Sequence, residues 1–145
     1  MNAKLPSKSD LKFLVAEDLR AETGGKVSLV GLIPGERLAV QGSAPPGVAF
    51  AIPSITFIFI LTGSSAGQFR GHFRIIAPDK KTVISDMPLE KPISKVAGRA
   101  TLFAAAAKPF VGPTLGTYSV HLDLGKVKFK FPLTIDKADD TKKKM

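Results

Sequence analysis

The sequence predicts an all-β protein, a single-domain antiparallel β-sandwich of about eight strands. Three observations lead to this prediction. Short runs rich in β-branched and aromatic residues recur along the chain, glycine and proline signals separate them, and no segment has the pattern of a long helix. The chain has 145 residues, which is enough to bury a core in one domain.

The N-terminal third predicts three strands and a long loop. The strands are expected at residues 12–19, 26–33 and 37–40. Gly24-Gly25 is typical of a hairpin turn between the first two strands, and Pro34-Gly35 is typical of a turn before the third. Residues 41–53, which are rich in glycine, alanine and proline, predict a loop.

The middle of the chain predicts a buried central strand followed by a half-buried one. The uncharged run ITFIFIL, residues 55–61, favours a central strand because β-branched and aromatic residues dominate it. In QFRGHFRII, residues 68–76, apolar and polar residues alternate, so one face is expected to be buried and the other to lie in water. The loop TGSSAG between them predicts a hairpin connection. A polar turn at residues 78–81 then leads into a short strand at residues 82–85.

The segment from residue 87 to residue 108 is the hardest to assign. Residues 87–98 contain two prolines and are expected to be irregular. In RATLFAAAAK, residues 99–108, alanine favours helix. Gly98 and Pro109 confine this segment, and its neighbours are strands, so we predict a strand.

The C-terminal third predicts a clear hairpin. TYSVHLDL, residues 117–124, and KVKFKF, residues 126–131, flank Gly125 and alternate between apolar and polar side chains. Pro132 cannot donate to a ladder, so the last strand is expected to lie at an edge or to end in a bulge. The apolar faces of these strands define the residues expected in or beside the core: Phe57, Phe59, Phe69, Phe73, Tyr118, Val120, Phe129 and Phe131. The domain boundaries follow as a flexible N-terminus at 1–11, the sandwich domain at 12–136 and a charged flexible tail at 137–145.

Composition excludes several classes of site. There is no cysteine, so disulfides, thiolate metal sites and cysteine nucleophiles are excluded. The N-terminus has no apolar segment typical of a signal peptide, and a chain without disulfides fits a cytoplasmic location. The uninterrupted apolar run is far shorter than the ~20 residues that a membrane-spanning helix needs, so no membrane span is expected.

No motif predicts catalysis, a cofactor or a metal. TGSSAG lacks the lysine and the following helix of a phosphate-binding loop. Its residues 63–67, GSSAG, have the spacing GxSxG, but a nucleophile elbow also needs a helix after the serine, and strand alternation follows here. His72 and His121 both face outward on expected strands, and they could hold a metal with Asp123 only if the strands were neighbours. Glu17 and Asp18 are adjacent in a strand and therefore point to opposite faces, which argues against an acid–base dyad. We expect a protein that is not an enzyme.

Basic residues form two stripes on the expected polar faces. The candidate polyanion-binding residues are Arg70, Arg74, Lys126, Lys128 and Lys130. The net charge of +9 would also attract an acidic partner such as nucleic acid. Nearly all strand aromatics fall on the core faces, however, which leaves few for stacking on bases. Lysines on an edge strand also prevent edge-to-edge pairing, and we prefer this interpretation.

Several segments together resemble a known family. FLVAEDLRAETGGKVSLVGLIPGE (residues 13–36), PSITFIFIL, QFRGHFRIIAPDKK and GTYSVHLDL are similar to a family of small bacterial β-sandwich proteins of unknown function. The resemblance covers most of residues 12–135 and implies a compact β-sandwich, with no catalytic or binding residues to carry over. The run Ala104 to Ala107 departs from it, because the family pattern has bulkier aliphatic residues there.

Two functions fit these sequence features best. The first is a non-enzymatic interaction module of unknown ligand, most readily a protein partner bound through loops or a sheet edge. The alternative is an electrostatic binder of nucleic acid or another polyanion through the basic strand faces. An unrecognised hydrolase is a distant third.

Overall fold

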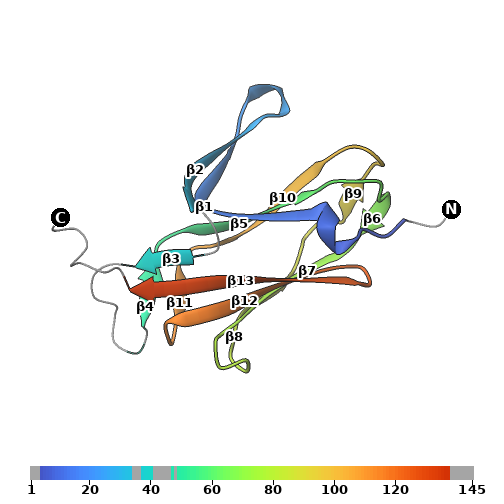
Figure 1. Ribbon diagram of the computed structural model, residues 1–145. Helices are drawn as coiled ribbons and strands as arrows, with labels where there is room; N and C mark the ends of the chain where they lie inside the picture. The colour runs from blue at the N-terminus through green and yellow to red at the C-terminus, as the bar shows by residue number, and fades with distance from the viewer. Residues whose placement is uncertain (1–3, 34–36, 41–46, 48, 138–145) are drawn as a thin grey trace.

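The protein is an all-β sandwich, as the sequence predicts. The computed structural model describes residues 4–33, 37–40, 47 and 49–137 (Figure 1), which form thirteen strands and two short 3-10 helices and contain no α-helix. Two main sheets face each other, and almost all strand pairs are antiparallel. The strand number exceeds the expected eight because four strands are only three residues long.

The first main sheet has four strands in the order β10-β5-β1-β2. Its strands are β1 (Leu11–Ala21), β2 (Val27–Ile33), β5 (Ile55–Leu61) and β10 (Thr101–Ala107). The 3-10 turn η2 (Thr23–Gly25) joins β1 to β2, and Gly24 has a φ of 79° there, so the predicted hairpin is confirmed. In β5 every residue except Ile60 is buried, as expected for a central strand. The ambiguous alanine-rich segment is a strand, β10, paired with β5.

The second main sheet has five strands in the order β3-β13-β12-β7-β8. Its strands are β3 (Arg37–Val40), β7 (Gly71–Ile76), β8 (Val83–Pro88), β12 (Gly116–Leu124) and β13 (Val127–Lys137). The β12–β13 hairpin alternates between buried and more exposed residues as predicted. The short strand β3 runs parallel to the end of β13.

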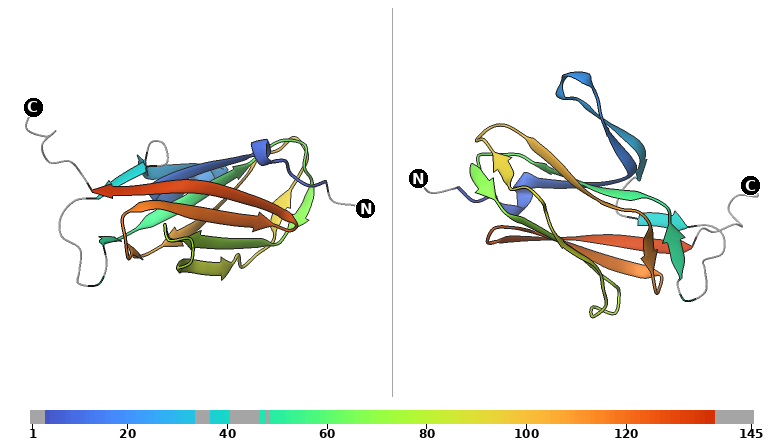
Figure 2. Two further views of the ribbon diagram at one scale, coloured as in Figure 1. Left: turned by 60° about the horizontal axis from the view of Figure 1, so that its bottom comes forward. Right: turned by 180° about the vertical axis from the view of Figure 1, so that it is seen from behind.

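Two small sheets lie toward the ends of the sandwich (Figure 2). One pairs β4 (Phe50–Ile52) with β11 (Phe110–Gly112), and the other pairs β6 (Gly67–Phe69) with β9 (Ile93–Lys95). The 3-10 turn η1 (Lys8–Asp10) precedes β1. Lys4 and Ala66 exchange two backbone hydrogen bonds of 3.0 Å, which attach the described N-terminal segment to the loop before β6.

Aromatic side chains fill the space between the two main sheets. Phe73 from the five-stranded sheet lies 5.3 Å from Phe57 and 6.1 Å from Phe59 of the four-stranded sheet, measured between ring centroids. The predicted core residues are confirmed: all are buried except Phe131, which is half-buried and packs against the core.

Three predictions about connections are wrong. TGSSAG is not a hairpin turn, because β5 pairs with β1 and β10 while the chain after the loop enters β6 and then β7 of other sheets. The expected loop at 41–53 contains β4, and the expected irregular segment at 87–98 contains the last two residues of β8 and all of β9. The short strands β4 and β9 form because they pair with β11 and β6, which are distant in sequence, and local composition does not indicate such pairing.

The last strand is longer than predicted. β13 continues through Pro132 to Lys137, and Pro132 lies opposite Ser119 of β12. Proline is tolerated there because β3 pairs only with residues 134–137, which leaves the other side of Pro132 without a described strand. The predicted turn at Pro34-Gly35 and the tail beyond Lys137 lie outside the described residues.

Candidate functional site

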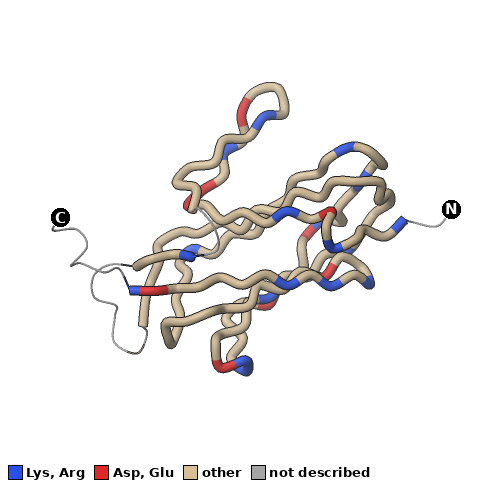
Figure 3. Tube along the Cα trace, viewed as in Figure 1, with Lys and Arg blue, Asp and Glu red and all other residues tan. Residues whose placement is uncertain are grey.

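The five predicted basic residues gather on and beside the outer face of the five-stranded sheet. Lys128 and Lys130 project from β13, and Arg74 projects from β7 on the far side of β12. Lys126 lies at the tip of the β12–β13 hairpin, and Arg70 lies beside this tip because its carbonyl accepts a 2.9 Å bond from the amide of Gly125. Figure 3 shows how basic positions recur along β13. We call these five residues the basic face.

Carboxylates interrupt the basic face. Asp123 of β12 lies between Lys128 and His72 in the sheet register, and Asp86 of β8 lies opposite Arg74. Neighbouring strands are about 4.8 Å apart, so these acids are direct neighbours of the basic groups. They lower the positive potential that a polyanion would meet on this face.

His121 lies at the centre of the basic face, between Lys130 and Arg74 in the register. Burial lowers its pKa, and the nearby charges of Arg74 and Lys130 lower it further, against a smaller opposing effect of Asp123. A groove of about 340 Å³ adjoins this histidine at the β13 edge, and Lys8 from η1 contributes to its lining. Lys8 therefore belongs to the same electropositive surface, although the sequence pattern did not indicate it.

The two histidines do not form a metal site with Asp123. His72 lies opposite Asp123, but its Nε2 contacts the Asp86 carboxylate instead, and His121 lies in the next row of the sheet. No group of three metal-ligating side chains occurs among the described residues. Glu17 and Asp18 also point apart as predicted, and Asp18 contacts Arg20 at 3.7 Å.

The TGSSAG loop has a structural role that the sequence did not indicate. Lys95 of β9 is only 3% exposed, and its Nζ donates hydrogen bonds to backbone carbonyls. The acceptors are Gly63 O at 2.9 Å, Ser65 O at 3.3 Å and Val96 O at 2.8 Å. These three bonds use all the donors of the ammonium group. The loop therefore presents carbonyls to an internal cation rather than amides to a phosphate.

The β1–β2 hairpin projects from the sandwich as an arm (Figures 1 and 2). Every residue from 21 to 28 is exposed, so neither face of its outer part is covered. Two apolar side chains of β2 are exposed as well, Val27 at 42% and Leu32 at 53%. A two-stranded hairpin with both faces in water is marginally stable by itself. We call residues 19–29 the hairpin arm.

The free edge of β2 differs from the other edges of the main sheets. Among the described residues β2 pairs only with β1, and its sequence VSLVGLI contains five aliphatic residues and no charge. In the five-stranded sheet, β3 begins with Arg37, and β8 contains Asp86 and Pro88. The uncharged edge strand β10 lies beside the chain around Ile93 across a shallow groove, and Thr101 Oγ1 donates to Ser94 O there. The β2 edge is thus a long apolar edge without the usual protection against pairing.

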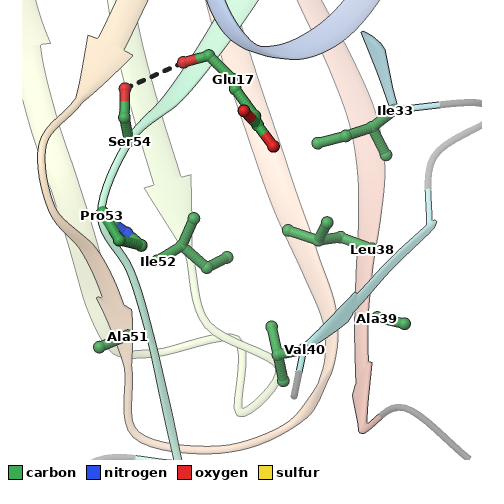
Figure 4. A pocket seen from close by; sticks show the side chains of 9 residues that line it. All are labelled: Glu17, Ile33, Leu38, Ala39, Val40, Ala51, Ile52, Pro53 and Ser54. Atoms are coloured by element: carbon green, nitrogen blue, oxygen red, sulfur yellow. Dashed lines mark hydrogen bonds between the residues drawn. The ribbon is translucent and has the colours of Figure 1, made fainter. Parts of the chain in front are cut away.

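An apolar groove lies next to the base of the hairpin arm (Figure 4). Its volume is about 390 Å³, within the range of ligand pockets. The lining side chains come from β1, β2, β3 and the β4–β5 segment: Glu17, Ile33, Leu38, Ala39, Val40, Ala51, Ile52, Pro53 and Ser54. Glu17 supplies the single ionisable group of this lining, and its side chain points toward the interior of the groove. Ser54 Oγ donates to the backbone carbonyl of Glu17 at 2.9 Å, which fixes the two walls relative to each other.

The comparisons with known proteins do not assign a family. No family model matches the chain. No curated protein matches it either. No helix among the described residues is long and apolar enough to cross a membrane.

Proposed function

We propose that the protein is a non-enzymatic, cytoplasmic interaction module that binds a protein partner by adding an extended segment of that partner to the free edge of β2. The observation that carries this proposal is the uncharged edge of β2, which no described strand pairs and which begins in the projecting hairpin arm. Main-chain hydrogen bonds to such an edge supply affinity, and pockets for alternate side chains supply specificity.

The energetics of the arm support this function. An unprotected apolar edge is prone to unwanted pairing, so natural sheets usually block such edges with charge or proline. β13 has this protection, because Lys128, Lys130 and Pro132 occupy alternate positions along it. β2 has neither a charged residue nor a proline. A partner strand would pair the open backbone groups of β2 and cover Val27 and Leu32.

Charge substitutions on the β2 edge test the proposal. Wild-type protein, Leu32→Lys and the matched control Val83→Lys, which alters an exposed valine on the β8 edge, would be used to capture proteins from native lysate with nuclease present. We expect wild type and the Val83→Lys control to capture the same partner protein. The Leu32→Lys variant should not capture it. Addition of the purified partner should then slow amide hydrogen exchange in residues 27–33. Equal capture by all three proteins, or protection confined to β13, would contradict the proposal.

A second candidate is binding of nucleic acid or another polyanion. The observation that favours it is the convergence of Arg70, Arg74, Lys126, Lys128 and Lys130 at one sheet face, with Lys8 close by. Asp86 and Asp123 among these groups weaken it. Salt dependence distinguishes the two candidates, because phosphate contacts release counterions and strand addition does not.

A further inference from the structure

The Glu17 side chain lies against Gly31 at the base of the hairpin arm. These residues are opposite one another in the register, between the pairs Ala16–Leu32 and Asp18–Val30. Gly31 has a φ of 67° and no side chain, and a Cβ placed there would lie 2.6 Å from Glu17 Cδ. The Glu17 side chain therefore reaches from β1 across the backbone of β2. This places its carboxylate closer to the free edge of β2 than it would be if it stayed above β1.

The Glu17 carboxylate has no cationic partner in the described part of the chain. All four salt bridges found there involve other acids. Around it the groove is formed by aliphatic side chains, chiefly Ile33, Leu38, Val40 and Ile52. A carboxylate bordered by aliphatic surface suits a side chain with an apolar stem and a cationic head, since lysine and arginine bury their stems and keep their charges at a polar partner.

We propose that the groove receives a lysine or arginine side chain from the strand that pairs with β2. This inference rests on the proposed strand addition and names its recognition chemistry. Residues directly opposite one another in neighbouring strands have their side chains on the same face of the sheet. The side chain of the residue opposite Gly31 is therefore on the face that carries Glu17 and Ile33. Its Cβ is about 5 Å from the β2 position, and no β2 side chain obstructs it.

The same geometry defines the residues that flank the basic position. Side chains two positions away on the same face lie opposite Leu29 and Ile33, and the intervening ones lie opposite Val30 and Leu32. All four of these β2 residues are aliphatic. The partner segment is therefore an apolar strand with a single basic residue at its centre.

Three peptides test the inference with the full-length chain. Each alternates valine and threonine and carries lysine, norleucine or glutamate at the central position. Their affinities would be measured by fluorescence anisotropy at low salt, and the amide resonances of Gly31 and Ile33 would locate the binding site. We expect the lysine peptide to bind about three- to ten-fold more tightly than the norleucine peptide and the glutamate peptide to bind most weakly.

Two variants make the test specific. In Glu17→Gln the preference for lysine over norleucine should disappear while the norleucine affinity is retained. In the matched control Glu22→Gln, which alters an exposed acid within the hairpin arm, the preference should persist. A lysine preference that survives Glu17→Gln overturns the inference. Equal binding of the lysine and norleucine peptides to wild type also overturns the inference. The proposed strand addition is still supported in that case if Leu32→Lys abolishes binding of both peptides. Both proposals are contradicted if none of the three peptides binds and if Leu32→Lys captures the same proteins from lysate as wild type does.

Discussion

Phe13 of β1 and Phe131 of β13 stack with their ring centroids 4.6 Å apart and their planes 12° from parallel. The two strands belong to different sheets, so this contact joins the layers. Both rings are half-buried. Along residues 127–133 no described strand pairs with β13 on the side away from β12, and β2 does not reach the first residues of β1. Aromatic packing, rather than a further strand, therefore joins the two sheets at this side.

Substitution at the centre of the aromatic core is expected to lower the free energy of unfolding far more than substitution at this side. Phe73 is 1% exposed and contacts Phe57 and Phe59 of the opposite sheet. Phe73→Ala should lower the free energy of unfolding by about 3–5 kcal/mol, since it removes buried ring surface and leaves a cavity. Urea denaturation followed by far-UV circular dichroism would measure the change. Phe131→Ala serves as the comparison and should cost less, because its ring is half-exposed; a reversed order would contradict a core centred on Phe73.

Lys95 is expected to stabilise the TGSSAG loop. In Lys95→Met the three ammonium bonds are lost, and although Gly63 O and Val96 O keep backbone donors, Ser65 O is left without its donor. We expect a loss of about 1–3 kcal/mol in the free energy of unfolding and faster amide exchange in residues 62–67. Lys91→Met, at an exposed position, should change stability by no more than about 0.5 kcal/mol. Equal effects of the two substitutions would show that the internal cation does not stabilise the loop.

Strand content could be predicted where the signal is local. The alternation in residues 68–76 and in the C-terminal hairpin reports directly which side chains are buried, and the structure agrees. The single strand expected over residues 68–76 is wrong, however, because the chain is divided at Arg70 into β6 and β7, which pair in different sheets. The alanine-rich segment became a strand against alanine's intrinsic preference, because pairing with β5 outweighs a propensity of a few tenths of a kcal/mol per residue.

The sites depended on contacts that no local pattern encodes. The basic face could be anticipated from alternation, but the acids within it come from the pairing of β7, β8 and β12. The groove brings together four separate segments, so no sequence motif indicated it. The absence of charge in VSLVGLI was a usable signal for an unprotected edge, yet only the sheet order shows that β2 is an edge strand.

His121 provides an internal probe of the basic face. Its pKa is lowered in the folded protein, first by burial and then by Arg74 and Lys130. The unfolded chain therefore binds the proton more readily, so this residue's contribution to stability is full above the ordinary histidine pKa of about 6.5 and is lost as the pH falls through that value toward the lower folded pKa. NMR titration of the His121 ring protons should show the lowered pKa in wild type.

Substitutions around His121 separate charge from burial. Lys130→Gln should raise the pKa of His121 because it removes a neighbouring positive charge, and Asp123→Asn should lower it further. Added salt should act like Lys130→Gln, since it screens charges at exposed positions. A pKa that none of these changes moves would mean that burial alone sets it, and that the basic face has little positive potential at its centre.

The three hairpin lysines distinguish the two candidate functions. Lys126, Lys128 and Lys130 are all exposed, and two of them lie on the part of the β13 edge that no described strand pairs. If the basic face binds a polyanion through five phosphate contacts, the log–log slope of affinity against salt should be about −3.5 to −4.5, and changing the three lysines to glutamine should reduce its magnitude by about 2 to 3. Fluorescence anisotropy with a labelled single-stranded oligonucleotide at several salt concentrations would measure both slopes.

We expect the oligonucleotide to bind weakly and without saturation, and the triple substitution to change this little, because Asp86 and Asp123 lie among the basic groups. The matched control replaces Lys80, Lys81 and Lys91, which are also exposed, and so removes the same charge elsewhere. Loss of the hairpin lysines should instead promote aggregation, visible as a larger hydrodynamic radius by light scattering, because it exposes an uncharged edge of β13 to pairing with other molecules. The control should not aggregate. Tight binding at physiological salt that only the hairpin triple substitution abolishes would reverse the ranking and make polyanion binding the better-supported function.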